Sequence, residues 1–181
     1  MYRFSKSLTL ATLLVVSMLL IGLVASENSA VQSQTKGQVE GVWKLVEVVP
    51  PPKSPDEKPT SITDPQPGLV ILTKGYYSSL VVRSRQPRAA VEPAKDPAHL
   101  TDAEKIARFE QWGPFTANSG TYELKGSTLE MHPIVAKSVD VMTSGKPITW
   151  EVKLEAPNTL WLIPPADRAA TDPRAKFTRL E

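Results

Sequence analysis

The side chains best suited to chemistry in this sequence are His132, Glu130 and Glu47. Because an imidazole titrates near neutral pH, His132 could act as a general base or bond a ligand carbonyl. It lies on a predicted strand, where alternation places it with Glu130 on the face opposite Leu129 and Met131. The polar face of a half-buried strand normally meets solvent. The pattern therefore favours a solvated histidine over a catalytic one.

Metal, nucleophile and phosphate chemistry find little support in the residue types. There is no cysteine, and the other histidine, His99, lies in a proline-bounded loop. A zinc site would therefore need carboxylates gathered from elsewhere, and Glu130 with His132 on one strand is a weak pair of ligands. The sequence has no serine triad signature, nucleophile elbow or glycine-rich phosphate loop. We predict no metal and no cofactor, and an enzyme is the less favoured interpretation.

Aromatic side chains on different predicted strands are a stronger indication of a binding site. If the strands close into a barrel, the rings that point inward would line a mainly apolar cavity with a few polar groups. An eight-stranded barrel is just wide enough to be filled by side chains or to hold one small molecule, so a filled core remains the alternative. The predicted ligand contacts are Tyr76 (or its neighbour Tyr77), Phe115, Tyr122, His132, Trp150 and Trp161.

The N-terminus has the features of a secretory signal peptide. Arg3 and Lys6 precede an apolar run over residues 8–25, and small residues follow at the positions that signal peptidase prefers. We expect cleavage before Glu27, which makes residues 1–26 the signal peptide and the protein secreted or periplasmic. The alternative is an uncleaved membrane anchor over residues 8–25, although that run is slightly shorter than the ~20 residues of a spanning helix.

Charge and length limit the partners and the number of domains. Without residues 1–26 the chain has 155 residues, which suits one domain. It then carries 19 Lys and Arg against 19 Asp and Glu, interspersed, so no basic patch predicts nucleic-acid binding. Residues 27–39 are polar and aperiodic and predict a flexible tether, which leaves residues 40–181 as the folded domain. Membrane contact is expected only through the N-terminal segment, if it is retained.

Eight strand-like segments, most of them joined by turns, make up the predicted domain. They span residues 41–49, 68–73, 76–83, 115–124, 127–133, 147–155, 159–163 and 175–180. Antiparallel strands with one apolar face must pack as two sheets or close into a barrel, so the fold class is all-β.

One helix is predicted between the third and fourth strands. Thr101 can cap it, and Glu104 three residues later completes a capping box. Apolar residues then recur at near-helical spacing as far as Trp112. Between the first two strands, residues 50–67 hold seven of the 17 prolines and are predicted to form a stiff lid or rim.

The order of these segments resembles the lipocalin-like (calycin-type) domain family, in its exported bacterial form. The similar stretches cover most of residues 40–181; they read GVWKLVEV, PGLVILTKGYYSSLVV, TDAEKIARFEQW, SGTYELKGSTLEMHP and KFTRLE. The resemblance implies an eight-stranded up-and-down antiparallel barrel with one short helix after the third strand. It also implies that Gly41 and Trp43 lie at the closed end, with Arg179 beside the indole ring. Trp43 is then a plug rather than a ligand contact.

The first strand contains one conflict with strict alternation. If Trp43 points inward, Glu47 should also point inward, and Val48 should face out. Three arrangements would resolve the conflict. They are a β-bulge, a helix that covers the outward-facing valines (Val42, Val46 and Val48), and a Glu47 carboxylate buried in the pocket. The bulge is the favoured explanation.

Three functions are compatible with the sequence. The favoured one is a non-enzymatic, exported barrel that binds a small apolar or amphipathic molecule. The second is an isomerase or cyclase on a hydrophobic substrate, with His132 and Glu130 or Glu47 as acid and base. The third is a structural or interaction module at the cell envelope, with a filled barrel and proline-rich contact loops. The sequence predicts neither the ligand nor the oligomeric state.

Overall fold

The computed structural model describes residues 36–54, 56–155 and 157–181. The expected signal peptide (1–26) and most of the predicted tether (27–39) therefore lie outside the described residues. Among the residues that are described, no helix has both the length and the apolar character needed to cross a membrane. Residues 39–181 form one unit, and the following account concerns that unit.

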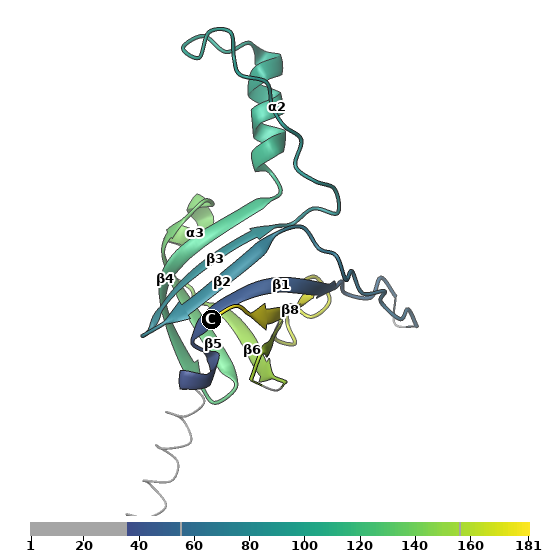
Figure 1. The fold of residues 1–181 in the computed structure, drawn as a ribbon, viewed down its shortest axis with the longest axis vertical. Coiled ribbons are helices and arrows are strands. Elements are labelled where there is room, and N and C mark those ends of the chain that lie inside the picture. Colours follow the sequence, from purple (N-terminus) through teal and green to yellow (C-terminus); the bar gives the residue numbers. More distant parts are fainter. Residues whose placement is uncertain (1–35, 55, 156) are drawn as a thin grey trace, which may run out of the picture. The chain divides into compact units, whose positions relative to one another are not determined.

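Eight antiparallel strands close into a barrel in chain order, with β8 returning to pair with β1 (Figure 1). The strands are β1 (Gly41–Val49), β2 (Gly68–Thr73), β3 (Tyr76–Val82), β4 (Phe115–Lys125), β5 (Thr128–Ala136), β6 (Ile148–Leu154), β7 (Thr159–Ile163) and β8 (Arg174–Arg179). The predicted all-β, up-and-down barrel is confirmed. Closure gives every strand two neighbours, which is how a barrel satisfies most of its backbone groups.

A bulge in β1 resolves the conflict at Glu47. Leu45 pairs with Phe177 and Glu47 pairs with Lys176, so Val46 is the extra residue. The extra residue reverses the alternation, and Val48 rather than Glu47 faces the interior. The Glu47 carboxylate lies 3.5 Å from the Lys176 ammonium. The favoured explanation from the sequence is therefore confirmed.

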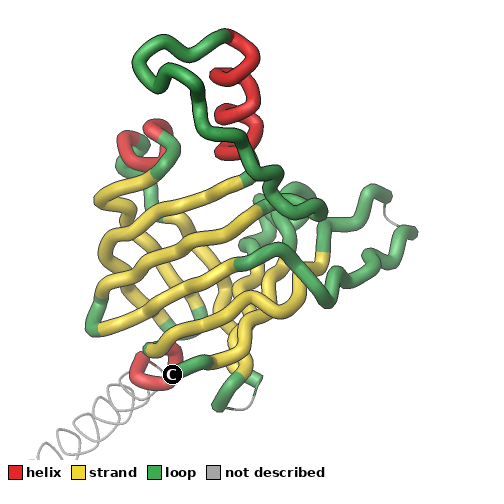
Figure 2. Tube along the Cα trace, turned by 45° about the horizontal axis from the view of Figure 1, so that its top comes forward, coloured by secondary structure: helices red, strands yellow, loops and turns green. Residues whose placement is uncertain are grey.

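The predicted helix is α2 (Asp102–Trp112), and its N-terminus has the expected capping box. The Thr101 hydroxyl accepts from the Glu104 backbone N–H, and the Glu104 carboxylate accepts from the Thr101 backbone N–H. The helix stands clear of the barrel beyond β4 and buries none of its side chains (Figures 1 and 2). Its apolar face is consequently exposed, with 77% of Phe109 open to solvent.

The connections differ between the two ends of the barrel. Tight turns join β2 to β3, β4 to β5 and β6 to β7 at one end, which we call the closed end. Long connections join β1 to β2, β3 to β4, β5 to β6 and β7 to β8 at the other, the open end (Figure 2). The β5–β6 connection contains a second helix, α3 (Val139–Thr143), which the sequence did not predict. Five residues are too few to show helical periodicity, and Ser138 makes no side-chain cap.

Candidate ligand-binding cavity

A tryptophan fills the closed end of the barrel. Trp43 is fully buried, and its indole Nε1 donates to the Val39 carbonyl oxygen at 2.8 Å. The Arg179 guanidinium lies 4.1 Å from the centre of the indole ring, and its Nε donates to the Pro157 carbonyl. Buried side chains surround this plug, among them Leu72, Leu129 and Leu160. Trp43 therefore packs the fold, and it lines neither of the two hollows that the described residues form.

The open half of the barrel is hollow. A cavity of about 570 Å³ reaches down to Val70, Met131 and Phe177. Its volume is within the range usual for small-molecule sites. Several of the inward-facing residues of the open half are small; they include Val48, Ser79, Val81, Thr116 and Ala175. At the closed end the inward positions hold larger side chains such as Trp43, Tyr77 and Tyr122, and this difference in side-chain volume explains why only one half is filled.

A few polar groups interrupt the apolar lining. Ser79, Thr116 and Asn118 contribute them from β3 and β4. The Asn118 Oδ1 atom is buried and has no hydrogen-bond partner among the residues that the structure describes. A buried acceptor without a partner costs free energy, so a donor group of a ligand or a water molecule would stabilise this position.

An arginine, an aspartate and a tryptophan form the polar part of the cavity wall near the mouth. Arg168 Nη1 donates to Asp172 Oδ2 at 2.9 Å, and Nη2 donates to the Thr149 carbonyl oxygen. The guanidinium carbon lies 5.0 Å from the centre of the Trp150 ring. Arg168, Asp172 and Trp150 all line the cavity. The contacts hold the Arg168 side chain in place at the boundary between the apolar interior and solvent.

The strand order, the tryptophan plug with its arginine, and the hollow open end together identify the architecture. The fold is lipocalin-like. Among solved structures, a lipocalin-like protein from Bacteroides uniformis has 16% sequence identity and a TM-score of 0.41, with 79% of this chain and 99% of that chain covered. An uncharacterized protein from Bacteroides eggerthii has 11% identity and a TM-score of 0.38, with 77% and 98% covered. No family model matches the sequence, and no curated protein matches it.

Of the six predicted ligand contacts, Trp150 lines the cavity of the lipocalin-like barrel. Tyr122 is buried below the cavity, at the closed end, with its Oη 3.4 Å from Glu40 Oε1. Its burial, and secondly the charge of Glu40, raise the pKa of Tyr122 to about 12. Tyr76 is 61% exposed on the outside, whereas its neighbour Tyr77 points inward and is buried.

Phe115, Trp161 and His132 lie on the outer side of the barrel wall. Phe115 packs edge-to-face against Trp112 at the base of α2, with ring centres 5.6 Å apart. Trp161 Nε1 donates to Glu155 at 3.0 Å, and Lys176 lies over its ring. The sequence contained a signal for this placement, because Leu160 and Leu162 flank Trp161 and occupy the inward positions.

The three weak catalytic candidates do not meet in one site. The nearest atoms of His132 and Glu130 are 4.0 Å apart on the outer face of β5, and Lys125 binds Glu130 at 2.7 Å. Glu47 faces outward from β1, where it pairs with Lys176. None of these side chains lines the cavity. Across the described part of the chain, no three metal-binding side chains cluster together.

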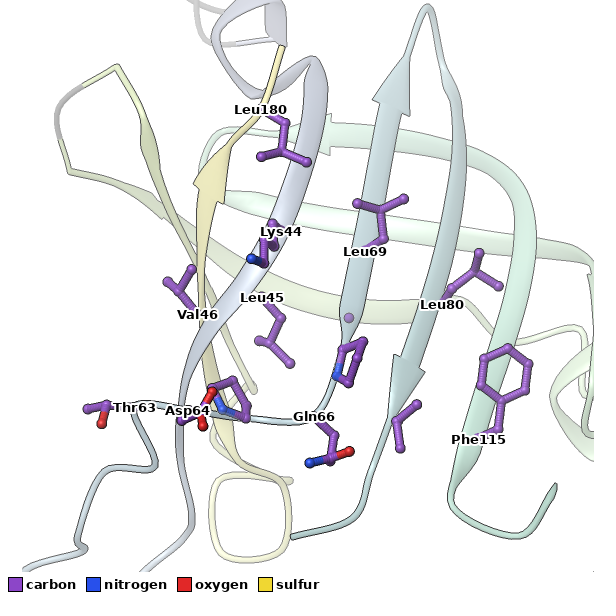
Figure 3. A pocket seen from close by; sticks show the side chains of 14 residues that line it. Lys44, Leu45, Val46, Thr63, Asp64, Gln66, Leu69, Leu80, Phe115 and Leu180 are labelled. Carbon is purple, nitrogen blue, oxygen red and sulfur yellow. The ribbon is translucent and has the colours of Figure 1, made fainter. Parts of the chain in front are cut away.

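A second hollow, of about 710 Å³, lies on the outer surface of β1, β2 and β3 (Figure 3). Leu69, Leu80 and Leu180 line it. It reaches the cavity wall because the pairing of β1 with β2 ends at Lys44 and Leu69. Beyond that pair, residues 62–67 of the proline-rich connection complete the wall.

The proline-rich connection is thus part of the cavity rather than a loop remote from it. The backbone N–H groups of Val48 and Ile62 each donate to the other residue's carbonyl oxygen, at 3.0 and 2.8 Å. Pro50, Pro51 and Pro65 of the same connection also line the cavity. This placement agrees with the rim predicted for residues 50–67. Because proline restricts φ, a segment rich in it holds its shape at low entropic cost.

Proposed function

We propose that this protein binds a small apolar or amphipathic molecule in the cavity at the open end of the barrel, without catalysing its conversion. The observation that carries the proposal is the cavity of about 570 Å³ among the inward-facing side chains of the open half. Burial of apolar ligand surface would supply roughly 25 cal/mol per Å². The few polar groups of the lining would fix the orientation of the ligand.

The arrangement lends less support to the two other functions. An isomerase or cyclase needs an acid or base within hydrogen-bonding reach of its substrate, and His132, Glu130 and Glu47 lie outside the cavity. A structural module with a filled barrel would have no need of the hollow half. We also propose that the protein is exported before it binds its ligand. The support for this is the signal-peptide pattern of residues 1–26.

The first experiment is native mass spectrometry of the protein purified from an exporting host. It measures the mass of the mature chain and of any molecule that co-purifies with it. A chain that begins at Glu27 and carries a stoichiometric small-molecule adduct would support export and binding together. Titration with a neutral naphthylamine fluorophore, whose emission rises in apolar sites, then measures occupancy of the cavity.

Two variants assign that binding to the cavity. Trp150→Asp places a carboxylate in the wall, and Ala175→Phe adds apolar volume to the lumen; each should weaken fluorophore binding at least tenfold. Trp161→Asp is the matched control, because Trp161 is on the outer wall, and it should change the affinity less than twofold. Equal affinity in all three folded variants would refute the assignment.

A further inference from the structure

We propose that the ligand is an anionic amphiphile, whose apolar tail occupies the cavity and whose acidic head group binds the arginines at the mouth. The inference rests on the proposed function and adds the chemical class of the ligand. Its head group is a carboxylate or a comparable acidic group. The residues that would bind it are Arg168, held against the cavity wall, and the more exposed Arg83 and Arg85.

The charges at the mouth are unequal. Among the described residues, the charged side chains that line the cavity are three arginines and one aspartate, which leaves a net charge of +2. Arg83 and Arg85 follow β3, whereas Arg168 and Asp172 belong to the β7–β8 connection. Two separate connections thus bring positive charge to one opening. Basic and acidic residues are equal in number beyond residue 26, so this surplus is local to the mouth.

Arg168 is positioned to receive a head group. A guanidinium has five N–H donors, and the contacts to Asp172 and Thr149 use two of them. The remaining donors lie on a group that is fixed by the Trp150 ring and whose side chain is 31% exposed. A fixed guanidinium loses little entropy on binding, and its planar geometry matches a carboxylate.

The polarity of the site runs along the barrel axis. Val70, Met131 and Phe177 form a floor that is apolar except on the side of β3 and β4, where Ser79 and Asn118 lie, and the three arginines stand at the opening. A molecule with an apolar tail and a charged end would match both regions at once. The Asp172 carboxylate would repel an anion, but Arg168 Nη1 lies 2.9 Å from Asp172 Oδ2 and compensates that charge. A cationic head group would instead meet Arg83 and Arg85, which pair with no carboxylate among the described residues.

The test compares three probes with the same alkyl tail and different head groups: dodecanoate, dodecanol and dodecylammonium. Each competes with the neutral naphthylamine fluorophore for the full chain at neutral pH. We expect dodecanoate to bind at least tenfold more tightly than dodecanol, as a charge-assisted hydrogen bond implies, and dodecylammonium most weakly. Added salt should reduce the preference, because Arg83 and Arg85 are exposed.

Variants assign the preference to the arginines of the mouth. Arg168→Gln should reduce the ratio of dodecanoate to dodecanol affinity at least fivefold. Arg174→Gln is the matched control, because Arg174 is exposed at the start of β8 and does not line the cavity. If Arg168→Gln does not fold, the double variant Arg83→Gln/Arg85→Gln changes two exposed residues and should also lower the ratio.

The outcomes separate the two levels of the proposal. If the fluorophore binds but the three alkyl probes displace it equally, the head-group inference is overturned and the proposed function stands. If dodecanoate keeps its preference in both Arg168→Gln and the double variant, its assignment to these arginines is overturned. If neither the fluorophore nor any alkyl probe binds, the proposed function itself fails.

Discussion

Replacing Gly41 by alanine should destabilise the barrel more than the same change at another glycine with positive φ. Gly41 has a φ of +146°, a conformation that L-residues rarely adopt. A Cβ atom there would also overlap the Glu181 carbonyl oxygen and lie 2.5 Å from Arg179 Nη1. The change would therefore strain the backbone and displace the guanidinium that covers the Trp43 ring.

The expected loss follows from these two effects. Backbone strain of this kind costs ~1–3 kcal/mol. Displacement of Arg179 weakens a cation–π contact worth ~0.5–2 kcal/mol and charge-assisted hydrogen bonds worth ~1.5–3 kcal/mol. The three ranges together give about 3–8 kcal/mol, which is a large part of the ~5–15 kcal/mol that stabilises a typical domain.

Gly126→Ala is the matched control for the strain alone. Gly126 also has a positive φ, +62°, but apart from its own residue and its chain neighbours no described atom lies within 4 Å of the position that its Cβ would take. Its cost should be only ~1–2 kcal/mol. Urea unfolding followed by tryptophan fluorescence gives both values, provided that the m-value is unchanged.

Equal losses in the two variants would refute the reasoning, because they would show that the contacts around Gly41 contribute nothing. A double-mutant cycle adds a second check. In an Arg179→Ala background, part of the overlap is absent, so Gly41→Ala should cost less than it does in the wild type.

Two further predictions concern buried and capped groups. The Tyr77 hydroxyl is buried without a partner among the described residues, so Tyr77→Phe should raise the free energy of unfolding near neutral pH by about 1 kcal/mol. Burial raises the pKa of Tyr77 to about 12, so the wild type should lose stability as pH rises from about 10 through 12, and the variant should lose less in alkaline urea titrations. Thr101→Ala removes the capping box of α2 and should cost that helix ~1 kcal/mol. Because α2 buries no side chain, hydrogen exchange of its amides should accelerate while global unfolding is unchanged.

The strands could be predicted because their alternation is local. In β6, Ile148, Trp150 and Val152 alternate with polar residues, and this pattern fixes both the strand and its inward face. The capping box of α2 is equally local, since two side chains three residues apart determine where the helix begins. The barrel then follows, because eight such strands have no other way to bury one face without free edges.

The residues of the candidate site were harder to predict than the strands. The size of an aromatic side chain does not indicate on which face of a strand its ring lies. Tyr76 and Tyr77 are adjacent, and only the pairing with β4 decides that Tyr77 points inward. Trp161 lies outside because Leu160 and Leu162 take the inward positions of β7, and there Lys176 lies over its ring and Glu155 accepts from its N–H. Arg168 lies in a connection without any periodicity, so its place beside Trp150 depends on the tertiary structure alone.

The hollow half of the barrel shows why the inward-facing residues of a strand cannot be assigned before its bulges are known. The bulge in β1 between Leu45 and Glu47 shifts the alternation, so Val48 at the open end is not in step with Trp43 at the closed end. Once that shift is applied, Val48 falls in the lumen. The same division separates two physical tasks. Trp43 and its neighbours bury the surface that stabilises the barrel, and the open end leaves uncovered the inward face where the proposed ligand would bind.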